Sequence, residues 1–202
     1  MSIRCRGHNA AGRIDMQDWN AYLAEFTPAK LPDETSAIRA CQLATQAAEL
    51  GTYGVGAVLL DGAGDIVAEG HNEVHTDRFR SDLHAEMVVI NRFETAHQGC
   101  RHPGSFTLVT SLEPCPMCMT RLIFAGIGTI LHVCADPVGG MVQHKTSLPP
   151  VFQQITAELA QVWGLAECSE ALRQAAFQIW DQSRLELDRR LVSRGNRRAG
   201  DT

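Results

Sequence analysis

Apolar runs of strand length alternate with helical stretches in the middle of this chain, and this alternation constrains its fold most. Residues 106–110 and 129–134 are two such runs, and residues 116–125 between them begin with proline and have the pattern of a helix. A strand–helix–strand order joins parallel strands, because the helix carries the chain back across one face of the sheet. The chain is therefore predicted to be an α/β protein with helices covering a sheet.

An antiparallel pair of strands precedes that unit. Residues 55–60 and 66–69 are apolar, and Asp61-Gly62-Ala63-Gly64-Asp65 between them has turn composition. A weaker fifth strand is expected at residues 165–168. Helices are expected over residues 33–50, with Asp33 as N-cap and Gly51 closing the end, and over 82–96, 148–162 and 171–192. The prediction is a three-layer α/β/α sandwich with a mixed five-stranded sheet.

The chain divides into three parts on these patterns. Residues 1–31 form an N-terminal extension, residues 32–170 the main domain, and residues 171–202 a helix with a basic tail. With 202 residues, 45% of them hydrophobic, the chain can bury a core without disulfides. In the extension, residues 16–26 carry Trp19, Tyr22, Leu23 and Phe26 at helical spacing. We expect this face to pack on the main domain; a lid or a dimer arm is the alternative.

Charge and cysteine usage narrow the compartment and the partners. The formal net charge of −5 counts against a general nucleic-acid binder, which is usually basic. No apolar run approaches the ~20 residues of a membrane helix. The seven cysteines are odd in number and scattered, which favours a reducing cytoplasm, where clustered cysteines bind metal more often than they form disulfides.

Two short motifs carry the chemistry. One is His84-Ala85-Glu86 and the other is Pro114-Cys115-Pro116-Met117-Cys118, each at the expected start of a helix. Proline suits the first helical position, which places Cys115 at the cap and Cys118 in the first turn, so that both sulfurs can reach one ion. With the imidazole of His84 they supply three ligands to Zn²⁺, and a tetrahedral ion keeps its fourth position for water.

Glu86 has a different role from the three ligands. Residues two apart on a regular helix point away from each other, so His84 and Glu86 can face one ion only if His84 lies at an irregular helix start. We predict that it does. Glu86 then lies beside the zinc-bound water and acts as a general acid and base, which would make it the catalytic residue.

Together these motifs resemble the zinc signature of the cytidine deaminase-like superfamily. Residues 111–118, Ser-Leu-Glu-Pro-Cys-Pro-Met-Cys, and residues 69–72, Glu-Gly-His-Asn, are most similar to the branch that holds guanine deaminases and tRNA adenosine deaminases. The resemblance covers residues 33–140. It implies one Zn²⁺ per chain on His84, Cys115 and Cys118, a bound water or hydroxide as nucleophile, Glu86 as proton shuttle and Asn72 as a substrate-binding residue. It also implies a homodimer.

The resemblance implies hydrolytic deamination, and the substrate is weighed separately. A free nucleobase, nucleoside or related aminated heterocycle is the first expectation, with guanine ahead of cytosine and adenine-type rings. Deamination of adenosine in tRNA is the first alternative, and a zinc-stabilised binding protein without catalysis is the second. Residues 184–198 hold six arginines against Glu186 and Asp188. We interpret them as the solvated end of a helix rather than an RNA contact, because that stretch has no aromatic residue for stacking.

Five other residues are candidates for the site. Arg78 and Arg80 are expected in a solvated loop, with a phosphate clamp as the alternative. His132 and Cys134 are possible further ligands, and we expect both in the core instead. Asp136 follows a strand end, where it either lines the pocket or caps the turn before Pro137.

Overall fold

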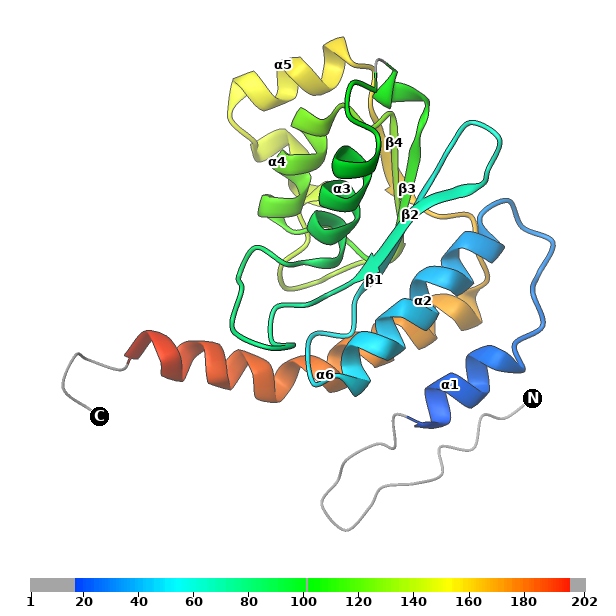
Figure 1. The fold of residues 1–202 in the computed structure, drawn as a ribbon, viewed down its shortest axis with the longest axis vertical. Coiled ribbons are helices and arrows are strands. Elements are labelled where there is room, and N and C mark those ends of the chain that lie inside the picture. The colour runs from blue at the N-terminus through cyan, green and yellow to red at the C-terminus, as the bar shows by residue number, and fades with distance from the viewer. Residues whose placement is uncertain (1–16, 101, 197–202) are drawn as a thin grey trace.

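The computed structural model describes residues 17–100 and 102–196 (Figure 1). Its centre is one five-stranded sheet in the order β2-β1-β3-β4-β5. The strands are β1 (Gly56–Leu60), β2 (Ile66–His71), β3 (Thr107–Leu112), β4 (Thr129–Cys134) and β5 (Val162–Leu165). β1 runs antiparallel to β2 and β3, whereas β3, β4 and β5 are parallel. The predicted mixed sheet is confirmed.

Helices cover both faces of the sheet. α2 (Glu34–Glu49) and α6 (Glu170–Asn196) pack together on one face. The other face carries α3 (Ala85–Ala96), α4 (Pro116–Ala125) and α5 (Pro150–Glu158), and Figure 1 shows the two groups on opposite sides of the strands. The predicted three-layer α/β/α arrangement is therefore confirmed. Two short 3₁₀ helices, Pro103–Ser105 and Val142–Ser147, lie in connections.

The described part of the N-terminal extension packs on the main domain, as expected from its apolar face. α1 (Gln17–Ala24) lies against α2, and Leu23 is buried. The Trp19 indole Nε1 donates a hydrogen bond to Gln182 Oε1 of α6 at 3.0 Å. Residues 1–16 lie outside the described part of the chain.

The ends of several elements differ from the prediction. The helix expected from residue 82 begins at Ala85, and the helix expected to end at residue 192 continues to Asn196. Asp33 occupies the N-cap position, but its carboxylate does not cap α2. Its Oδ2 accepts the backbone N–H of Glu167 at 2.7 Å instead, which ties the start of α2 to the segment before α6. Gly51 closes α2 with a left-handed φ of 77°, as predicted.

The predicted position of the fifth strand is wrong. It runs over Val162–Leu165 rather than residues 165–168, and α5 ends at Glu158 rather than continuing to residue 162. The reason is Ala160, whose φ of 51° turns the chain out of the helix and into β5. Alanine rarely adopts a left-handed φ, so this turn cannot be predicted from the residue type.

A second tie joins α2 to α6 inside the core. Glu34 is 1% exposed, and its carboxylate accepts the Ser169 backbone N–H and hydroxyl, each at 2.7 Å. A buried carboxylate is stable only when its oxygens are hydrogen-bonded, so these two donors matter to the fold. Among the described helices, none is both long and apolar enough to cross a membrane.

Candidate active site

The two motifs meet because each lies at the N-terminus of a helix on the same face of the sheet. His84 is the N-cap of α3, with extended backbone angles of φ −67° and ψ 157°. Cys115 is the N-cap of α4, with φ −72° and ψ 170°, and Pro116 is the first helical residue. Both predictions about local geometry are confirmed: His84 lies outside the regular helix, and Cys118 lies in the first turn of α4.

The candidate ligand atoms are close enough to share one ion. Those of His84, Cys115 and Cys118 all lie within 4.8 Å of one another, and Cys115 Sγ is 3.6 Å from His84 Nδ1. A tetrahedral Zn²⁺ with usual bond lengths separates its sulfur and nitrogen ligands by about 3.6–3.8 Å. Two sulfurs and one imidazole nitrogen are also a donor set that zinc prefers. The residues present therefore fit this ion.

The surroundings of Cys115 favour its thiolate. Hydrogen bonding to Cys118, followed by the contact with His84, lowers the pKa of Cys115 to about 4 against the opposing effect of burial. Cys115 also caps a helix N-terminus, where partial positive charge stabilises an anion. Because metals bind thiolates rather than thiols, this position is suited to a metal ligand.

Glu86 lies beside the ligand cluster. Its side chain is 4% exposed, with Oε2 at 3.4 Å from Cys118 Sγ. The hydroxyl of Thr110 on β3 donates to Oε1 at 3.2 Å and so orients the carboxylate. Burial, and then the charge of Cys115, raises the pKa of Glu86. A raised pKa makes a carboxylate a better proton acceptor than a free one.

Asn72 is buried at the end of β2, with 2% of its surface exposed. Its Oδ1 accepts the Thr52 hydroxyl at 2.6 Å and the Val74 N–H at 3.0 Å. These two contacts use the acceptor side of the amide and direct its NH₂ group away from them. Asn72 lines the same pocket as His84 and Glu86, and these two contacts do not use its NH₂ donors.

Glu113 holds in place the loop of residues 136–143, which lines part of the pocket. It is 2% exposed and accepts the backbone N–H groups of Asp136 and Gln143, as well as the Gln143 side-chain amide. A Cβ at Gly140 would lie 2.4 Å from Glu113 Cδ, so the loop packs closely on this carboxylate. Asp136 lines the pocket and also accepts the N–H groups of Val138 and Gly139, which combines the two roles weighed for it.

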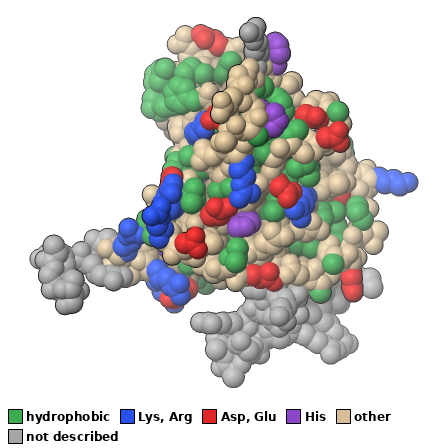
Figure 2. Space-filling view, in the orientation of Figure 1, with side chains coloured by type: hydrophobic (Ala, Val, Ile, Leu, Met, Phe, Trp, Pro, Cys, Tyr) green, Lys and Arg blue, Asp and Glu red, His purple; other side chains and the backbone are tan. Residues whose placement is uncertain are grey.

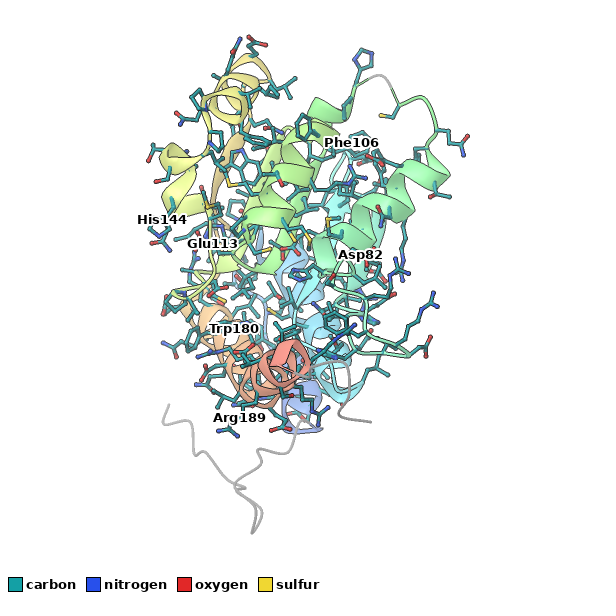
Figure 3. All side chains as sticks on the ribbon, turned by 90° about the vertical axis from the view of Figure 1, so that its left-hand side faces the viewer. Asp82, Phe106, Glu113, His144, Trp180 and Arg189 are labelled. Atoms are coloured by element: carbon teal, nitrogen blue, oxygen red, sulfur yellow. The ribbon has the colours of Figure 1, made fainter. Side chains whose placement is uncertain are left out.

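The pocket has a volume of about 300 Å³, and α6 forms one of its walls. The pocket is lined by Trp180, Arg184, Asp188 and Leu191 of α6 together with His84, Cys115 and Glu86. Figure 3 shows Trp180 on α6, below Glu113 in that view. Sequence patterns did not point to these residues, because the face of α6 that they share has no motif. The sequence patterns did not point to Thr110 or Glu113 either, although Thr110 lies on β3 and Glu113 directly follows it, just before the cysteine motif.

The remaining sequence candidates lie away from the ligand cluster. Arg78 and Arg80 are exposed, and Arg80 pairs with Asp82 at 2.7 Å, as a solvated loop requires. His132 and Cys134 are buried on β4, as expected, with exposures of 3% and 6%. Cys134 Sγ contacts the Ser111 carbonyl at 3.2 Å and is not among the clustered ligand atoms.

Comparison with known proteins decides the family. The family model described as "Cytidine and deoxycytidylate deaminase zinc-binding region" matches residues 32–134, about half of the chain. This chain belongs to that family. The match contains His84, Glu86, Cys115 and Cys118, and it ends before β5 and α6. The resemblance inferred from the two motifs is therefore confirmed, and with it membership in a family of zinc-binding deaminases.

Relatives with curated names are similar over more than half of the chain. The tRNA-specific adenosine deaminase of Bacillus subtilis is 38% identical over 108 residues, which are 54% of this chain and 65% of that protein. The tRNA(Ile)-lysidine synthase of Deinococcus radiodurans is 42% identical over 127 residues, which are 62% of this chain and 19% of that much longer protein. The chain thus spans less than two thirds of each of these relatives.

Two solved structures have the same fold. A tRNA:A34 deaminase superposes with a TM-score of 0.57 at 27% identity, covering 69% of this chain and 94% of that one. The guanine deaminase of Nitrosomonas europaea superposes with a TM-score of 0.59 at 16% identity, covering 88% of this chain and 98% of that one. Both support the sheet and helix arrangement described above.

Proposed function

We propose that this deaminase uses a zinc ion held by His84, Cys115 and Cys118 to hydrolyse an exocyclic amino group from a heterocyclic ring, with release of ammonia. The observation that carries the proposal is the buried carboxylate of Glu86 beside the three candidate ligands. A structural zinc site needs only its ligands. A catalytic site also needs a group that transfers protons. Glu86 is suited to this role, because it lies next to the cluster without being one of the candidate ligands and has a raised pKa.

Each side chain then has a definable task. A zinc ion at this position supplies the Lewis acidity that makes water a nucleophile near neutral pH. Glu86 accepts the proton of the attacking water and delivers it to the departing amino nitrogen, while Thr110 keeps the carboxylate oriented. The Asn72 NH₂ donates to an acceptor atom of the ring and so fixes which carbon faces the attack. The loop held by Glu113 forms another wall of the pocket.

Adenosine in tRNA is the first candidate substrate. It is supported by the 38% identity to a tRNA-specific adenosine deaminase and by an arginine next to the pocket. Arg194 stacks on Phe79, a pocket residue, at 3.7 Å from the ring centroid. Figure 2 shows Lys and Arg side chains where α6 extends from the body, at the lower left. Phosphates that flank a target nucleotide could bind there. The sequence alone favours a free base over RNA, whereas the similarity to a tRNA-specific adenosine deaminase favours the reverse order.

A free nucleobase or nucleoside is the second candidate. One observation favours it: α6 contributes a whole wall of the pocket and narrows the space around a ligand. A pocket volume of about 300 Å³ is at the small end of the usual range for small-molecule sites. A zinc-stabilised binding protein without catalysis is disfavoured, because it would not need a buried carboxylate beside the candidate ligands.

The test is ammonia release by the zinc-loaded protein. The substrates are a tRNA anticodon stem-loop with adenosine at the wobble position, the common bases, and their nucleosides and monophosphates, with Glu86→Gln as the inactive control. Ammonia from the stem-loop alone establishes the first candidate, and ammonia from a base or nucleoside alone establishes the second. No ammonia from any substrate, with zinc bound, rejects the deaminase proposal.

A further inference from the structure

The wall that α6 builds carries polar groups for which the deamination chemistry has no use. Tyr53, Arg184 and Asp188 line the pocket along with His84 and Cys115, but none of the three belongs to the ligand cluster. Asp188 and Arg184 lie one helical turn apart on α6, so their side chains share a face of that helix. A polar wall away from the reacting centre is placed to contact the part of a substrate that does not react.

Asp188 has acceptor capacity to spare. Its Oδ1 accepts the Tyr53 hydroxyl at 3.2 Å, and its Oδ2 accepts Arg184 Nη1 at 3.4 Å. An ionised carboxylate offers about four acceptor positions, so about two remain. The side chain is 49% exposed, and the residue lines the pocket, so these positions are open to a ligand. Tyr53 stays a donor at any working pH, because burial and Asp188 raise its pKa to about 12.

Arg184 cannot turn this wall into a phosphate site. Its guanidinium stacks on Trp180 at 4.7 Å and already contacts two carboxylates, Asp181 and Asp188. Within the described part of the chain, it is the one arginine or lysine among the pocket residues, which also include Glu86, Glu113, Asp136 and Asp188. The excess of carboxylates disfavours an anionic group inside the pocket. It favours neutral hydrogen-bond donors such as hydroxyl groups.

The wall is held in place before any ligand arrives. The Gly54 N–H donates to Ser183 Oγ of α6 at 2.8 Å. A Cβ at Gly54 would lie 2.8 Å from the Ile179 carbonyl oxygen, so α6 packs closely on the segment that leads into β1. Tyr53 belongs to the same segment. Because its position relative to Asp188 is set by packing, the polar wall is preorganised.

We propose that Asp188, positioned by Tyr53 and Arg184, binds a sugar hydroxyl of the substrate and so forms a sugar subsite in the pocket. The proposal rests on the proposed deaminase function and adds a substrate class to it: the ring enters this pocket as a nucleoside unit rather than as a bare base, and without a phosphate inside the pocket. The acceptor atoms of Asp188 match the O–H donors of ribose. A bare base leaves this carboxylate without a ligand partner.

The experiment compares bases with their nucleosides on the zinc-loaded full chain. Ammonia release and titration calorimetry are run with adenine and adenosine, guanine and guanosine, cytosine and cytidine, and the three 5′-monophosphates. The variants are Asp188→Asn and, as the matched control, Asp181→Asn. Asp181 contacts Arg184 as Asp188 does but does not line the pocket.

The wild type is expected to prefer the nucleoside to the base and to its monophosphate. Asp188→Asn is expected to reduce that nucleoside preference about 10- to 100-fold, mainly through KM or Kd, because a hydrogen bond to a charged group is lost. The values for the bare base should not change, and Asp181→Asn should keep the full preference.

Three results overturn the subsite: a wild type that binds base and nucleoside equally, a loss that is the same for both in Asp188→Asn, or an equal loss in Asp181→Asn. The failure of the deaminase proposal is a separate observation. If no compound releases ammonia, calorimetry with the same pairs still decides whether Asp188 binds the sugar.

Discussion

The two ends of the pocket are built in different ways. At the metal end, His84 and Cys115 are the N-caps of neighbouring helices, and Cys118 and Glu86 lie in the first turns of those helices. At the other end, Tyr53 meets Asp188 across 135 residues of chain. Local backbone geometry therefore places the candidate ligands and Glu86, whereas tertiary packing places the groups that would contact the rest of the substrate.

This difference implies that the two ends can be disturbed separately. The family match ends at residue 134, before α6 begins at Glu170. Changes at the metal end should abolish the reaction whatever the substrate. Changes at the α6 wall should alter which substrate is preferred while the metal stays bound. The following substitutions test that separation.

The largest effect is expected from Cys118→Ser. A serine hydroxyl is a poor zinc ligand, so the metal content should fall from about one ion per chain to nearly none, and activity should be lost with it. Elemental analysis after gel filtration measures the metal. Cys100→Ser is the control, because Cys100 is exposed and outside the cluster. If Cys118→Ser retained a full equivalent of zinc, the assigned ligand set would be wrong.

Glu86→Gln should separate chemistry from metal binding. Zinc content should stay near the wild-type value, while kcat falls about 10²- to 10⁴-fold because the proton shuttle is gone. Steady-state kinetics and elemental analysis are measured on the same preparation. Glu158→Gln on the exposed side of α5 controls for loss of a carboxylate elsewhere. A Glu86→Gln variant with near-normal kcat would rule out the assigned role.

Gly54→Ala should disturb the α6 wall and spare the metal end. The new methyl group would lie 2.8 Å from the Ile179 carbonyl, so α6 has to shift, and overpacking of this kind costs about 1–3 kcal/mol of unfolding free energy. Urea denaturation measures the loss. The zinc content should be unchanged. Gly62→Ala is the matched control, because its methyl group would meet nothing closer than 3.9 Å. Equal stability of the two variants would contradict the close packing of α6.

The smallest effect is expected in the pH dependence of stability, to which Tyr53 contributes through its contact with Asp188 in the α6 wall. The pKa of Tyr53 is raised from 10 to about 12 by burial and by Asp188. Its protonated form is therefore favoured in the folded state. The stabilising contribution is complete below pH 10 and is lost as the pH rises towards 12. The melting temperature of the wild type should fall more steeply between pH 10 and 12 than that of Tyr53→Phe.

Tyr22→Phe serves as the control for that comparison, since it removes the other tyrosine of the chain. Burial raises the pKa of Tyr22 as well, but no carboxylate contributes to that rise. A Tyr22→Phe variant should therefore keep most of the wild-type slope. If Tyr53→Phe and the wild type lost stability in parallel, the Tyr53–Asp188 contact would not contribute to folding.

The same contrast explains how far the sequence predicted this molecule. Pro116 fixes the start of α4, so the positions of Cys115 and Cys118 followed from residue type and spacing. The sheet and its layers followed from the alternation of apolar runs. Ala160 could not be anticipated, because its left-handed φ depends on the packing of β5 rather than on its residue type. Asp188 was invisible for a related reason: its partner Tyr53 is distant in sequence, and no spacing rule joins them.

The contact between Glu34 and Ser169 has a consequence during synthesis of the chain. Glu34 leaves the ribosome 135 residues before the serine that donates to its carboxylate. At about 5–20 residues per second, that interval lasts about 7–27 s. All five strands emerge within that interval, but until Ser169 follows them the chain lacks the donors for an acidic group that the finished core encloses. The metal end can form while the chain is still being translated, whereas the pocket acquires its far wall only once α6 has emerged.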